Sequence, residues 1–283
     1  MLNGCAYILT VDVGNTFIRF GLFAEDSAAA RECPLATCEI TTPSSITADE
    51  ARMRLAQVMA ALAADAGMPG ALVPTAAVLS CVVPALERPW KTALSRTCTG
   101  RVLTVGPGLK TGMPVHYDDP AEIGPDRIAD AVAVRAVYGS PCIVIDLGTT
   151  TNIEVIDARG TFVGGVIAPG LALGARSLSA AAARLPQVEP SAPTHVIGRN
   201  TREAMRSGVV LGEVARIDGM LDMVLAEMRA TKAAGEGDVP IVITGDDAEA
   251  LAALVGHSLT VDDALTLRGL AELYRINQKP RRV

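Results

Sequence analysis

The hydrophobic positions at the start of the chain fall into two short apolar runs separated by a turn. Residues 6–13 form the first run, the sequence Gly14, Asn15, Thr16 interrupts it, and residues 17–23 form the second. Apolar runs of this length on either side of a Gly/Asn turn are typical of a β-hairpin. The chain is therefore predicted to open with two antiparallel strands.

A helix is predicted next, over residues 48–66. Thr47 and Glu50 form a capping box in front of it, apolar residues repeat along one face with helical spacing, and Gly67 ends it. Two strands are expected to follow, over 76–83 and 101–105. A Gly- and Pro-rich connector over 106–125 then leads to a second helix over 126–137, with Asp126 as its N-cap.

The opening pattern returns in the second half of the chain. Asp12 begins the sequence D-V-G-N-T after an apolar run, and Asp146 begins D-L-G-T-T after another, 134 residues later. A repeat at close to half the chain length indicates two related domains rather than a solenoid. Strands and helices alternate here, which favours an α/β architecture: strands over 142–147, 153–156, 162–167 and 239–244, and helices over 203–229 and 265–274.

Charge and composition exclude several classes of protein. The formal net charge is −6 and the pI about 5.2, which argues against nucleic acid as a partner. Mean hydropathy is +0.33, yet the sequence has no apolar run as long as a membrane span. The first eight residues lack the basic segment of a signal peptide. The basic residues at 279–282 are interpreted as a solvated end.

The six cysteines form no C-x-x-C pair. Cys5, Cys81 and Cys142 lie inside apolar, strand-like runs, which is typical of buried thiols. Reduced thiols in a cytoplasmic protein are therefore expected, rather than a zinc site or a disulfide framework.

The two D-x-G-[NT]-T turns are candidate phosphate-binding sites. Glycine after a strand allows the backbone to approach a ligand closely, and the exposed N–H and hydroxyl groups suit phosphate oxygens. The aspartate would hold a cation such as Mg²⁺ that bridges to the phosphates. One copy alone favours an ordinary hairpin turn, but two copies at half-chain spacing favour a nucleotide clamp. The sequence contains no P-loop.

A third constellation is G-P-D-R, from Gly124 to Arg127. It places a carboxylate and a guanidinium at the start of a predicted helix, where backbone N–H groups also attract anions. Asp126 could take the proton of a substrate hydroxyl, and Arg127 could hold a substrate carboxylate. On these four residues alone, a capped helix with a solvated arginine is the alternative interpretation.

Taken in order, the motifs resemble those of type III pantothenate kinases, in the acetate kinase/sugar kinase/Hsp70/actin superfamily. The resemblance spans about residues 6–274. The motifs that carry it are D-V-G-N-T at 12–16, S-C-V-V-P at 80–84, Tyr117, G-P-D-R at 124–127, D-L-G-T-T at 146–150, G-G-V-I-A-P-G at 164–170, I-G-R-N-T at 197–201 and L-T-L-R-G-L at 265–270.

This resemblance implies a fold and an activity. The expected fold is α/β, with two related RNase H-like (actin-like ATPase) domains, mixed sheets and an active-site cleft between them. The domains are expected over 1–115 and 116–283, the second with a dimerisation helix at 203–229. The implied activity is ATP-dependent phosphorylation of pantothenate in the cytoplasm by a homodimer that uses Mg²⁺ and a monovalent cation, K⁺ or NH₄⁺.

The resemblance also implies roles for individual residues. Asp126 is similar to the catalytic base, Asp146 to the monovalent-cation ligand, and Asp12 is a candidate Mg²⁺ ligand. The ATP-binding residues would be Asp12, Val13, Gly14, Asn15, Thr16, Phe17, Ile18, Arg19 and Thr149. The pantothenate-binding residues would be Tyr117, Gly124, Pro125, Asp126, Arg127 and, from across the dimer interface, Thr201.

Three departures from the family pattern stand out. Pro125 replaces the usual alanine of G-A-D-R, and Asp246 replaces the second glycine of a late T-G-G. The segment between Phe23 and Thr42 lacks an expected Trp-containing strand, and its Cys33 and Cys38 have no assigned role. These departures leave two alternatives to an active pantothenate kinase: a catalytically silent binding or regulatory protein, and a kinase of another hydroxy-acid.

Overall fold

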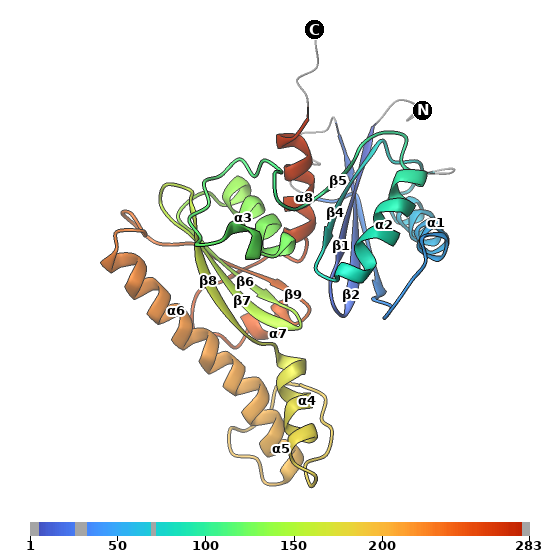
Figure 1. Cartoon of the computed structure of the whole chain (residues 1–283). Helices are drawn as coiled ribbons and strands as arrows, with labels where there is room; N and C mark the ends of the chain where they lie inside the picture. The colour runs from blue at the N-terminus through green and yellow to red at the C-terminus, as the bar shows by residue number, and fades with distance from the viewer. Residues whose placement is uncertain (1–5, 26–32, 69–71, 279–283) are drawn as a thin grey trace. The chain divides into compact units, whose positions relative to one another are not determined.

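The computed structural model describes residues 6–25, 33–68 and 72–278 (Figure 1). Cys5 and the basic residues at 279–282 lie outside this range. The chain forms two compact units. The first contains the described residues up to Val137 and those from Ala264 onward, and the second contains Tyr138–Asp263. Within the described residues, no helix combines the length and the apolar composition that a membrane span requires.

The first unit is built on a five-stranded mixed sheet in the order β3-β2-β1-β4-β5. Its central strand β1 pairs antiparallel with β2 and parallel with β4. The strands are β1 (Tyr7–Val13), β2 (Phe17–Ala24), β3 (Ala36–Thr41), β4 (Ala76–Cys81) and β5 (Val102–Thr104). The predicted opening hairpin is therefore confirmed, and it forms the centre of the sheet.

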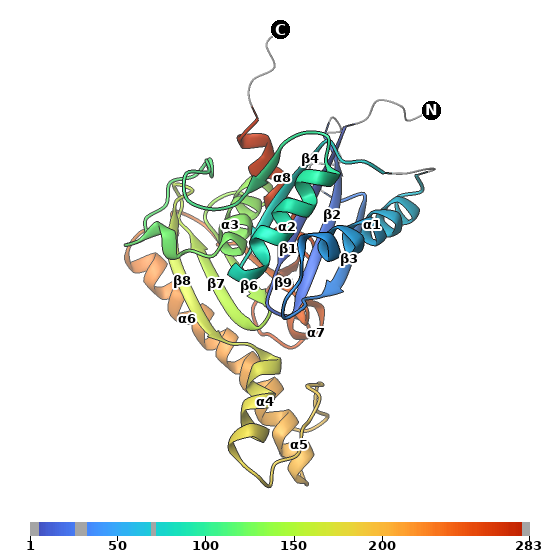
Figure 2. The same cartoon turned by 45° about the vertical axis from the view of Figure 1, so that its right-hand side comes forward.

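Helices cover both faces of this sheet. On one face, α1 (Ala48–Asp65) and α2 (Pro84–Thr97) pack against each other and against the strands (Figure 2). On the other, α8 (Leu265–Ile276) contacts β1 and β4 and packs along α3 (Pro125–Val137). A Cβ atom on Gly269 of α8 would lie 1.9 Å from the Ala129 carbonyl oxygen of α3, so only glycine permits this approach.

Strand alternation decides which side chains face which helices. Leu9, Val11 and Val13 of β1 belong to the core formed with α1 and α2. Because successive side chains of a strand point to opposite faces, Asp12 faces the side covered by α3 and α8.

The second unit repeats this arrangement. Its sheet has the order β10-β9-β6-β7-β8, and the central β6 pairs antiparallel with β7 and parallel with β9. The strands are β6 (Cys142–Leu147), β7 (Thr150–Ile156), β8 (Phe162–Pro169), β9 (Ile241–Gly245) and β10 (Thr260–Val261). If the strands of each unit are numbered by their order along the chain, both sheets have the spatial order third, second, first, fourth, fifth. The predicted α/β fold with two related mixed-sheet domains is confirmed.

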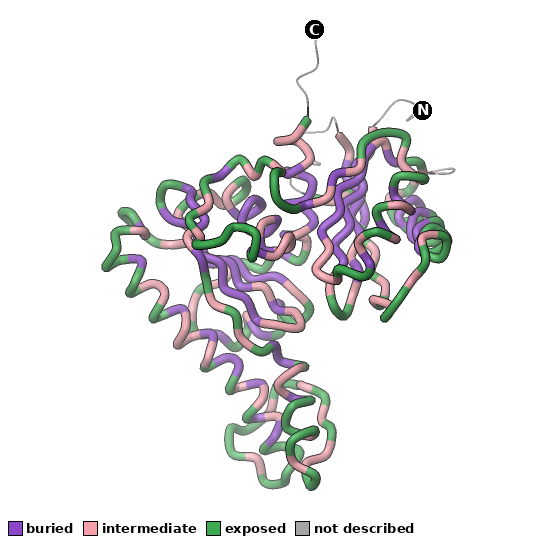
Figure 3. The backbone as a smooth tube through the Cα atoms, viewed as in Figure 1, coloured by how far each residue is buried: buried purple, intermediate pink, exposed green. Residues whose placement is uncertain are grey.

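A long helical segment packs against one face of the second sheet. It begins with α5 (Thr201–Arg206), continues through the π-helical turn η3 (Ser207–Leu211) and ends with α6 (Gly212–Ala230). Apolar residues of α6 share a core with β6 and β7, whose strands are buried in Figure 3. The segment continues past the sheet to α4 (Leu171–Ala181) (Figure 1). The single helix predicted over 203–229 is thus longer at its start and interrupted by a π-turn.

Several elements escaped sequence-based prediction. Helix α2 contains Pro84 and Pro89, which concealed the four-residue spacing of its buried Leu86, Trp90 and Leu94. A strand, β3, does lie between Phe23 and Thr42, although it has no tryptophan. Helix α4, the 3₁₀ turn η2 (Pro120–Glu122), the five-residue α7 (Ala248–Ala252) and the two-residue β10 were also missed.

The division of the chain also differs from the expected one. The predicted boundary lay between residues 115 and 116, whereas the compact units divide after Val137 and again before Ala264. The reason is that α3 and α8, far apart in sequence, pack on each other and on the first sheet.

Candidate active site

The first D-x-G-N-T turn lies at the carboxyl end of the central strand β1. The Gly14 N–H donates to the Phe17 carbonyl at 3.0 Å and closes the hairpin. Thr42, just after the edge strand β3, holds the turn from outside. Its hydroxyl donates to the Gly14 carbonyl at 2.8 Å, and its N–H donates to the Thr16 carbonyl at 2.9 Å. Asn15 and Thr16 are exposed at the tip of the turn, where a ligand could reach them.

Asp12, the first residue of this motif, is a buried carboxylate on the last-but-one position of β1. It lies opposite Ser80 in the parallel register with β4. Its Oδ1 atom is buried and accepts no hydrogen bond from the described residues. Burial, and then the negative charge of Asp126, raise the pKa of Asp12 to about 6, although Ser80 and Arg19 act in the opposite direction. This environment favours a proton or a bound cation at Asp12.

Asp126 lies in the first turn of α3, which begins at Pro125. Its Oδ1 atom accepts a hydrogen bond from the Arg127 N–H at 2.8 Å. A Cβ atom on Gly124 would lie 2.3 Å from that same oxygen, so glycine leaves the room that the carboxylate occupies. Burial raises the pKa of Asp126, and the hydrogen bond from Arg127 partly offsets this. The prediction that Asp126 is the N-cap was wrong, because Pro125 takes the first helical position, where proline is favoured.

The first unit therefore brings two of the predicted acidic residues together. Asp12 arrives on a strand and Asp126 on the helix that covers the same face of the sheet, close enough for one charge to raise the pKa of the other. Two carboxylates in a desolvated place cannot both be ionised cheaply. Asp12 is therefore suited to carry a proton or to attract a cation that accompanies a phosphorylated ligand.

The other predicted ATP-binding residues of the first hairpin divide by side-chain orientation. Val13 and Ile18 are completely buried in the core, so their side chains are structural. Arg19 is partly exposed and pairs with Glu39 on β3, with 3.0 Å between Nε and Oε2. The turn, the Asp12 carboxylate and the partly exposed Arg19 guanidinium present polar groups of the kind that phosphate or its counter-ion requires.

Two further predicted substrate residues belong to the first unit. Arg127 is buried on α3, next to Asp126 in sequence. Tyr117 is half-buried in the connector that precedes α3. The structure thus places Tyr117 and Gly124–Arg127 in the same unit as Asp12.

The second D-x-G-T-T turn occupies the equivalent place in the second unit, between β6 and β7. The Gly148 N–H donates to the Thr150 carbonyl at 3.0 Å, and the Gly170 N–H donates to the Thr149 carbonyl at 3.1 Å. A Cβ atom on Gly170 would lie 2.3 Å from the Gly148 carbonyl oxygen. Asp146 and Thr149 are both half-buried at the end of β6. The turn is therefore tightly braced by the chain that follows β8.

Asp246, which departs from the family pattern, directly follows β9, the strand that pairs with β6 beside this second turn. Gly245 ends β9 with a φ of +102°, and a Cβ atom there would lie 2.1 Å from the Leu147 carbonyl oxygen, so glycine is required at this position. The next residue, Asp246, is exposed and donates its N–H to the Leu147 carbonyl at 2.9 Å. The glycine that the fold needs is retained, and the substitution falls on the exposed position.

Thr201 is the most peripheral of the predicted residues. It is the exposed first residue of α5, whose N-cap is Asn200, with the Asn200 side chain accepting a hydrogen bond from the Glu203 N–H. The predicted residues thus divide between the units, with Asp146, Thr149 and Thr201 in the second.

Residues that support the turns were missed from sequence. Thr42 and Glu213 lie outside all of the family motifs, and only their tertiary contacts identify them as residues that support the turns. Ser80 was quoted as part of S-C-V-V-P but given no role, although its hydroxyl lowers the pKa of Asp12.

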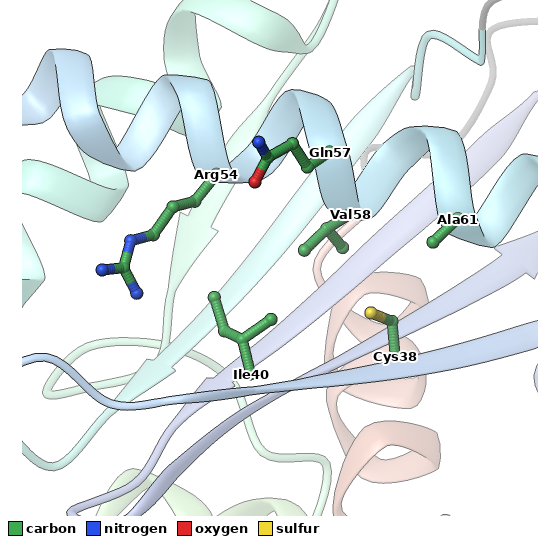
Figure 4. Close-up of a pocket in the computed structure, with 6 residues that line it drawn as sticks. All are labelled: Cys38, Ile40, Arg54, Gln57, Val58 and Ala61. Carbon is green, nitrogen blue, oxygen red and sulfur yellow. The ribbon is translucent and has the colours of Figure 1, made fainter.

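A pocket of about 410 Å³ lies elsewhere in the first unit, between α1 and β3 (Figure 4). It is lined by Cys38, Ile40, Arg54, Gln57, Val58 and Ala61. Because it lies on the α1 face of the sheet, it is on the opposite face from Asp12, and none of the predicted site residues lines it. Cys38, which had no assigned role, is part of this pocket, and burial raises the pKa of its thiol.

No cluster of three or more His, Cys, Asp or Glu side chains that could hold a metal ion is present among the described residues. A cation at Asp12 or Asp146 would therefore take most of its ligands from the nucleotide, water and backbone carbonyl groups. The buried Oδ1 atom of Asp12 fits such a role, because a cation would supply the partner that this oxygen lacks among the described residues.

Comparison with known proteins identifies relatives over almost the whole chain. The sequence model of the type III pantothenate kinase family matches residues 8–223. The type III pantothenate kinase of Nocardia farcinica is 40% identical over 279 residues, covering 97% of this chain and 99% of that protein. The type III pantothenate kinase of Koribacter versatilis is 37% identical over 275 residues, covering 96% of each.

Solved structures show the same fold at lower identity. A Campylobacter jejuni protein named as a Baf family transcriptional activator matches with a TM-score of 0.57 and 18% identity, over 95% of this chain and 98% of its own. The ethanolamine utilization protein EutJ of Carboxydothermus hydrogenoformans matches with a TM-score of 0.52 and 15% identity, over 94% and 89%. At these identities the likeness concerns the fold alone.

Replacing Asp12 by Asn is expected to stabilise the first unit at neutral pH. The pKa of Asp12 is raised from 3.8 to about 6 in the folded chain, so its ionisation lowers stability increasingly as the pH rises above about 4, and the full loss is reached above about 6. The variant should gain on the order of 1–3 kcal/mol at pH 7.5, and the gain should disappear as the pH falls to about 4. Urea denaturation monitored by the fluorescence of the single tryptophan, Trp90, reports on this unit.

The control for this measurement is Asp118→Asn, which changes an exposed carboxylate of the same unit. It should leave the denaturation midpoint unchanged at both pH values. Equal midpoints for wild type and Asp12→Asn at pH 7.5 would contradict the assigned environment of Asp12.

Proposed function

The chain belongs to the type III pantothenate kinase family, and we propose that it transfers the γ-phosphate of ATP to the primary hydroxyl group of pantothenate, the first step of coenzyme A synthesis. The observation that carries this proposal within the structure is the desolvated Asp126 carboxylate at the start of α3, beside Gly124 and Arg127. It supplies a proton acceptor and an anion-binding group in one turn of helix, as phosphorylation of a hydroxy-acid requires.

Asp126 is assigned as the general base. Burial raises its pKa, which moves the group closer to the working pH and makes it a stronger proton acceptor than an exposed carboxylate. The hydrogen bond from the Arg127 N–H fixes one oxygen, so the other remains to receive the hydroxyl proton of pantothenate. The hydroxyl oxygen then attacks the γ-phosphorus, and ADP leaves.

The two D-x-G turns are assigned to the phosphates of ATP. Residues Asp12–Arg19 and Thr149 would contribute backbone N–H groups and the hydroxyl groups of Thr16 and Thr149. The sequence has no P-loop and hence no P-loop lysine, so the phosphate charge must be balanced mainly by cations. Mg²⁺ would approach Asp12, whose buried Oδ1 atom is available to it, and it would supply charge neutralisation when bound.

A monovalent cation, K⁺ or NH₄⁺, is assigned to Asp146. This half-buried carboxylate occupies in the second unit the position that Asp12 occupies in the first. Carbonyl oxygens cluster around the neighbouring turn, since Gly170 packs against the carbonyls of Gly148 and Thr149. Carboxylate and carbonyl oxygens are the ligands that such cations accept.

Pantothenate is assigned to Tyr117, Gly124, Pro125, Asp126, Arg127 and Thr201. Arg127 would bind its carboxylate, because a guanidinium offers paired donors that match a carboxylate. Pro125 is compatible with this role, since the helix begins at that residue without distortion of the Asp126 hydrogen bond.

A homodimer formed through the second unit is part of the proposal, with Thr201 reaching the partner's site. Large apolar side chains are exposed in and near the α4–α5 region. Val196 is 74% exposed and Ile197 82% exposed, while Ile167 on β8 is 60% exposed. Exposed apolar groups gathered on one region are typical of protein interfaces.

The cytoplasm is proposed as the site of action. The described cysteines, which are Cys33, Cys38, Cys81, Cys98 and Cys142, are free thiols. Free thiols, rather than disulfides, are typical of a reducing compartment.

The Asp126→Asn variant tests the reaction and the base together. Wild type should release ADP in a coupled assay that contains pantothenate, ATP, Mg²⁺ and K⁺, and the variant should lower kcat by about 10²–10⁴-fold, the range for loss of a general base. Circular dichroism should show an unchanged fold. Nucleotide and pantothenate binding without turnover by wild type would instead identify a catalytically silent protein, and turnover only with another hydroxy-acid would identify a different kinase.

Replacing K⁺ by Na⁺ tests the second cation site. Activity should fall by about tenfold or more, since loss of a well-matched charged ligand costs 1.5 kcal/mol or more in binding. Asp146→Asn should lower activity in K⁺ and remove most of the difference between the two salts. Equal rates of the wild type in K⁺ and Na⁺ would remove this role from Asp146.

Mixing two inactive variants tests the shared site. Asp126→Asn and Thr201→Tyr should each be inactive alone, but subunit exchange should restore about a quarter of wild-type activity. Half of randomly formed dimers are then hybrids, and each hybrid has one intact site if Thr201 acts across a two-fold interface. No recovery after confirmed exchange would mean that Thr201 acts within its own protomer or not at all.

A further inference from the structure

An ion pair on α6, whose carboxylate is buried, contacts the strands that flank the second D-x-G turn. The Glu213 side chain is only 4% exposed, and it pairs with Arg216 one helical turn further on. The Thr151 hydroxyl, itself buried on β7, donates to the other carboxylate oxygen of Glu213 at 2.6 Å. Thr151 immediately follows the turn Gly148–Thr150, so the carboxylate is anchored to the first residue beyond it.

The same pair also holds the opposite strand. The Arg216 guanidinium donates to the Pro169 carbonyl at the end of β8. Pro169 lies opposite Thr150 in the antiparallel register of β7 and β8. The next residue, Gly170, donates its N–H to the Thr149 carbonyl. Glu213 and Arg216 therefore connect α6 to both strands at the point where they support the turn.

Stability alone is a weak reason for this arrangement. Removing the Glu213 carboxylate from water costs several kcal/mol, and well-packed apolar residues are often as stabilising as an ion pair at such a place. What this network does provide is a fixed geometry. One Glu213 oxygen accepts from Thr151 and the other from Arg216. Arg216 also donates to the Pro169 carbonyl. Here that geometry is imposed on the backbone of a candidate phosphate-binding turn.

We propose that Glu213 and Arg216 are positioning residues, which hold the Gly148–Thr150 turn in the arrangement that the phosphates of ATP require. The inference rests on the proposed function of that turn. Neither side chain is assigned to ATP or pantothenate. Their effect reaches the nucleotide through Thr151, Pro169 and the backbone of the turn, and it continues into the helical segment that begins at Thr201.

The test is Glu213→Gln, with Glu227→Gln as the matched control. The control makes the same substitution on an exposed residue of the same helix. Glu213→Gln should raise KM for ATP by about fivefold or more, as expected from a lost charge-assisted hydrogen bond, and should leave KM for pantothenate within twofold. Glu227→Gln should change neither constant. A merely structural role would lower the amount of folded enzyme without this separation of the two KM values.

A second readout does not depend on turnover. Amide hydrogen exchange followed by mass spectrometry should show faster exchange in the peptide that contains Gly148–Thr150 for Glu213→Gln, and no change for Glu227→Gln. If wild type fails to turn over but the exchange result holds, the proposed function fails and the positioning role stands. If wild type is active and Glu213→Gln changes neither KM for ATP nor exchange at the turn, the positioning role is overturned.

A milder variant keeps the proposal testable if Glu213→Gln does not fold. Arg216 has a side chain that is 33% exposed, so Arg216→Gln should be tolerated better than a change at buried Glu213. It should raise KM for ATP and exchange at the turn in the same direction, by a smaller factor. Wild-type values for both measurements would again overturn the proposal.

Discussion

The structure depends on a constraint of the central strand in each sheet. Strands β1 and β6 are flanked on both sides and covered on both faces, so nearly all of their side chains must be apolar. A hydroxyl can lie within such a strand, as Thr10 does by donating to the Gly21 carbonyl, but the carboxylates lie near the carboxyl end. Asp12 and Asp146 occupy the last-but-one position of their strands, and the Gly-containing turn that follows exposes backbone N–H groups. The candidate site is therefore built where each central strand leaves the core.

The two units use this shared plan in different ways. In the first, strand alternation turns Asp12 toward the helices α3 and α8, and α3 brings a second carboxylate, Asp126, to the same face. Burial of both carboxylates, together with the charge of Asp126 near Asp12, then favours a proton or a cation on that face. In the second, the added polar groups lie on the opposite face, where Glu213 and Arg216 of α6 brace the strands next to the turn. The first unit thus places two acidic side chains on one face of its sheet, whereas the second uses its added polar groups to hold the backbone next to its turn.

The two substitutions that depart from the family pattern fall where the backbone tolerates them. Pro125 occupies the first position of α3, where its fixed φ is favourable and its missing N–H is not needed. Asp246 follows Gly245, the residue whose positive φ and contact with Leu147 demand glycine, and its own side chain is exposed. Neither change removes a contact that the described site depends on.

The sequence by itself determined the opening hairpin, the capping box of α1, the half-chain repeat and the motifs that name the family, because these depend on local periodicity and turn chemistry. It did not determine that α3 and α8 complete the first unit, that the charge of Asp126 raises the pKa of Asp12, or that Thr42 and Glu213 hold the turns. Those facts arise from contacts between segments 28 to more than 100 residues apart. The local pattern of residues does not predict such contacts, because they depend on how helices and strands that are distant in sequence pack together.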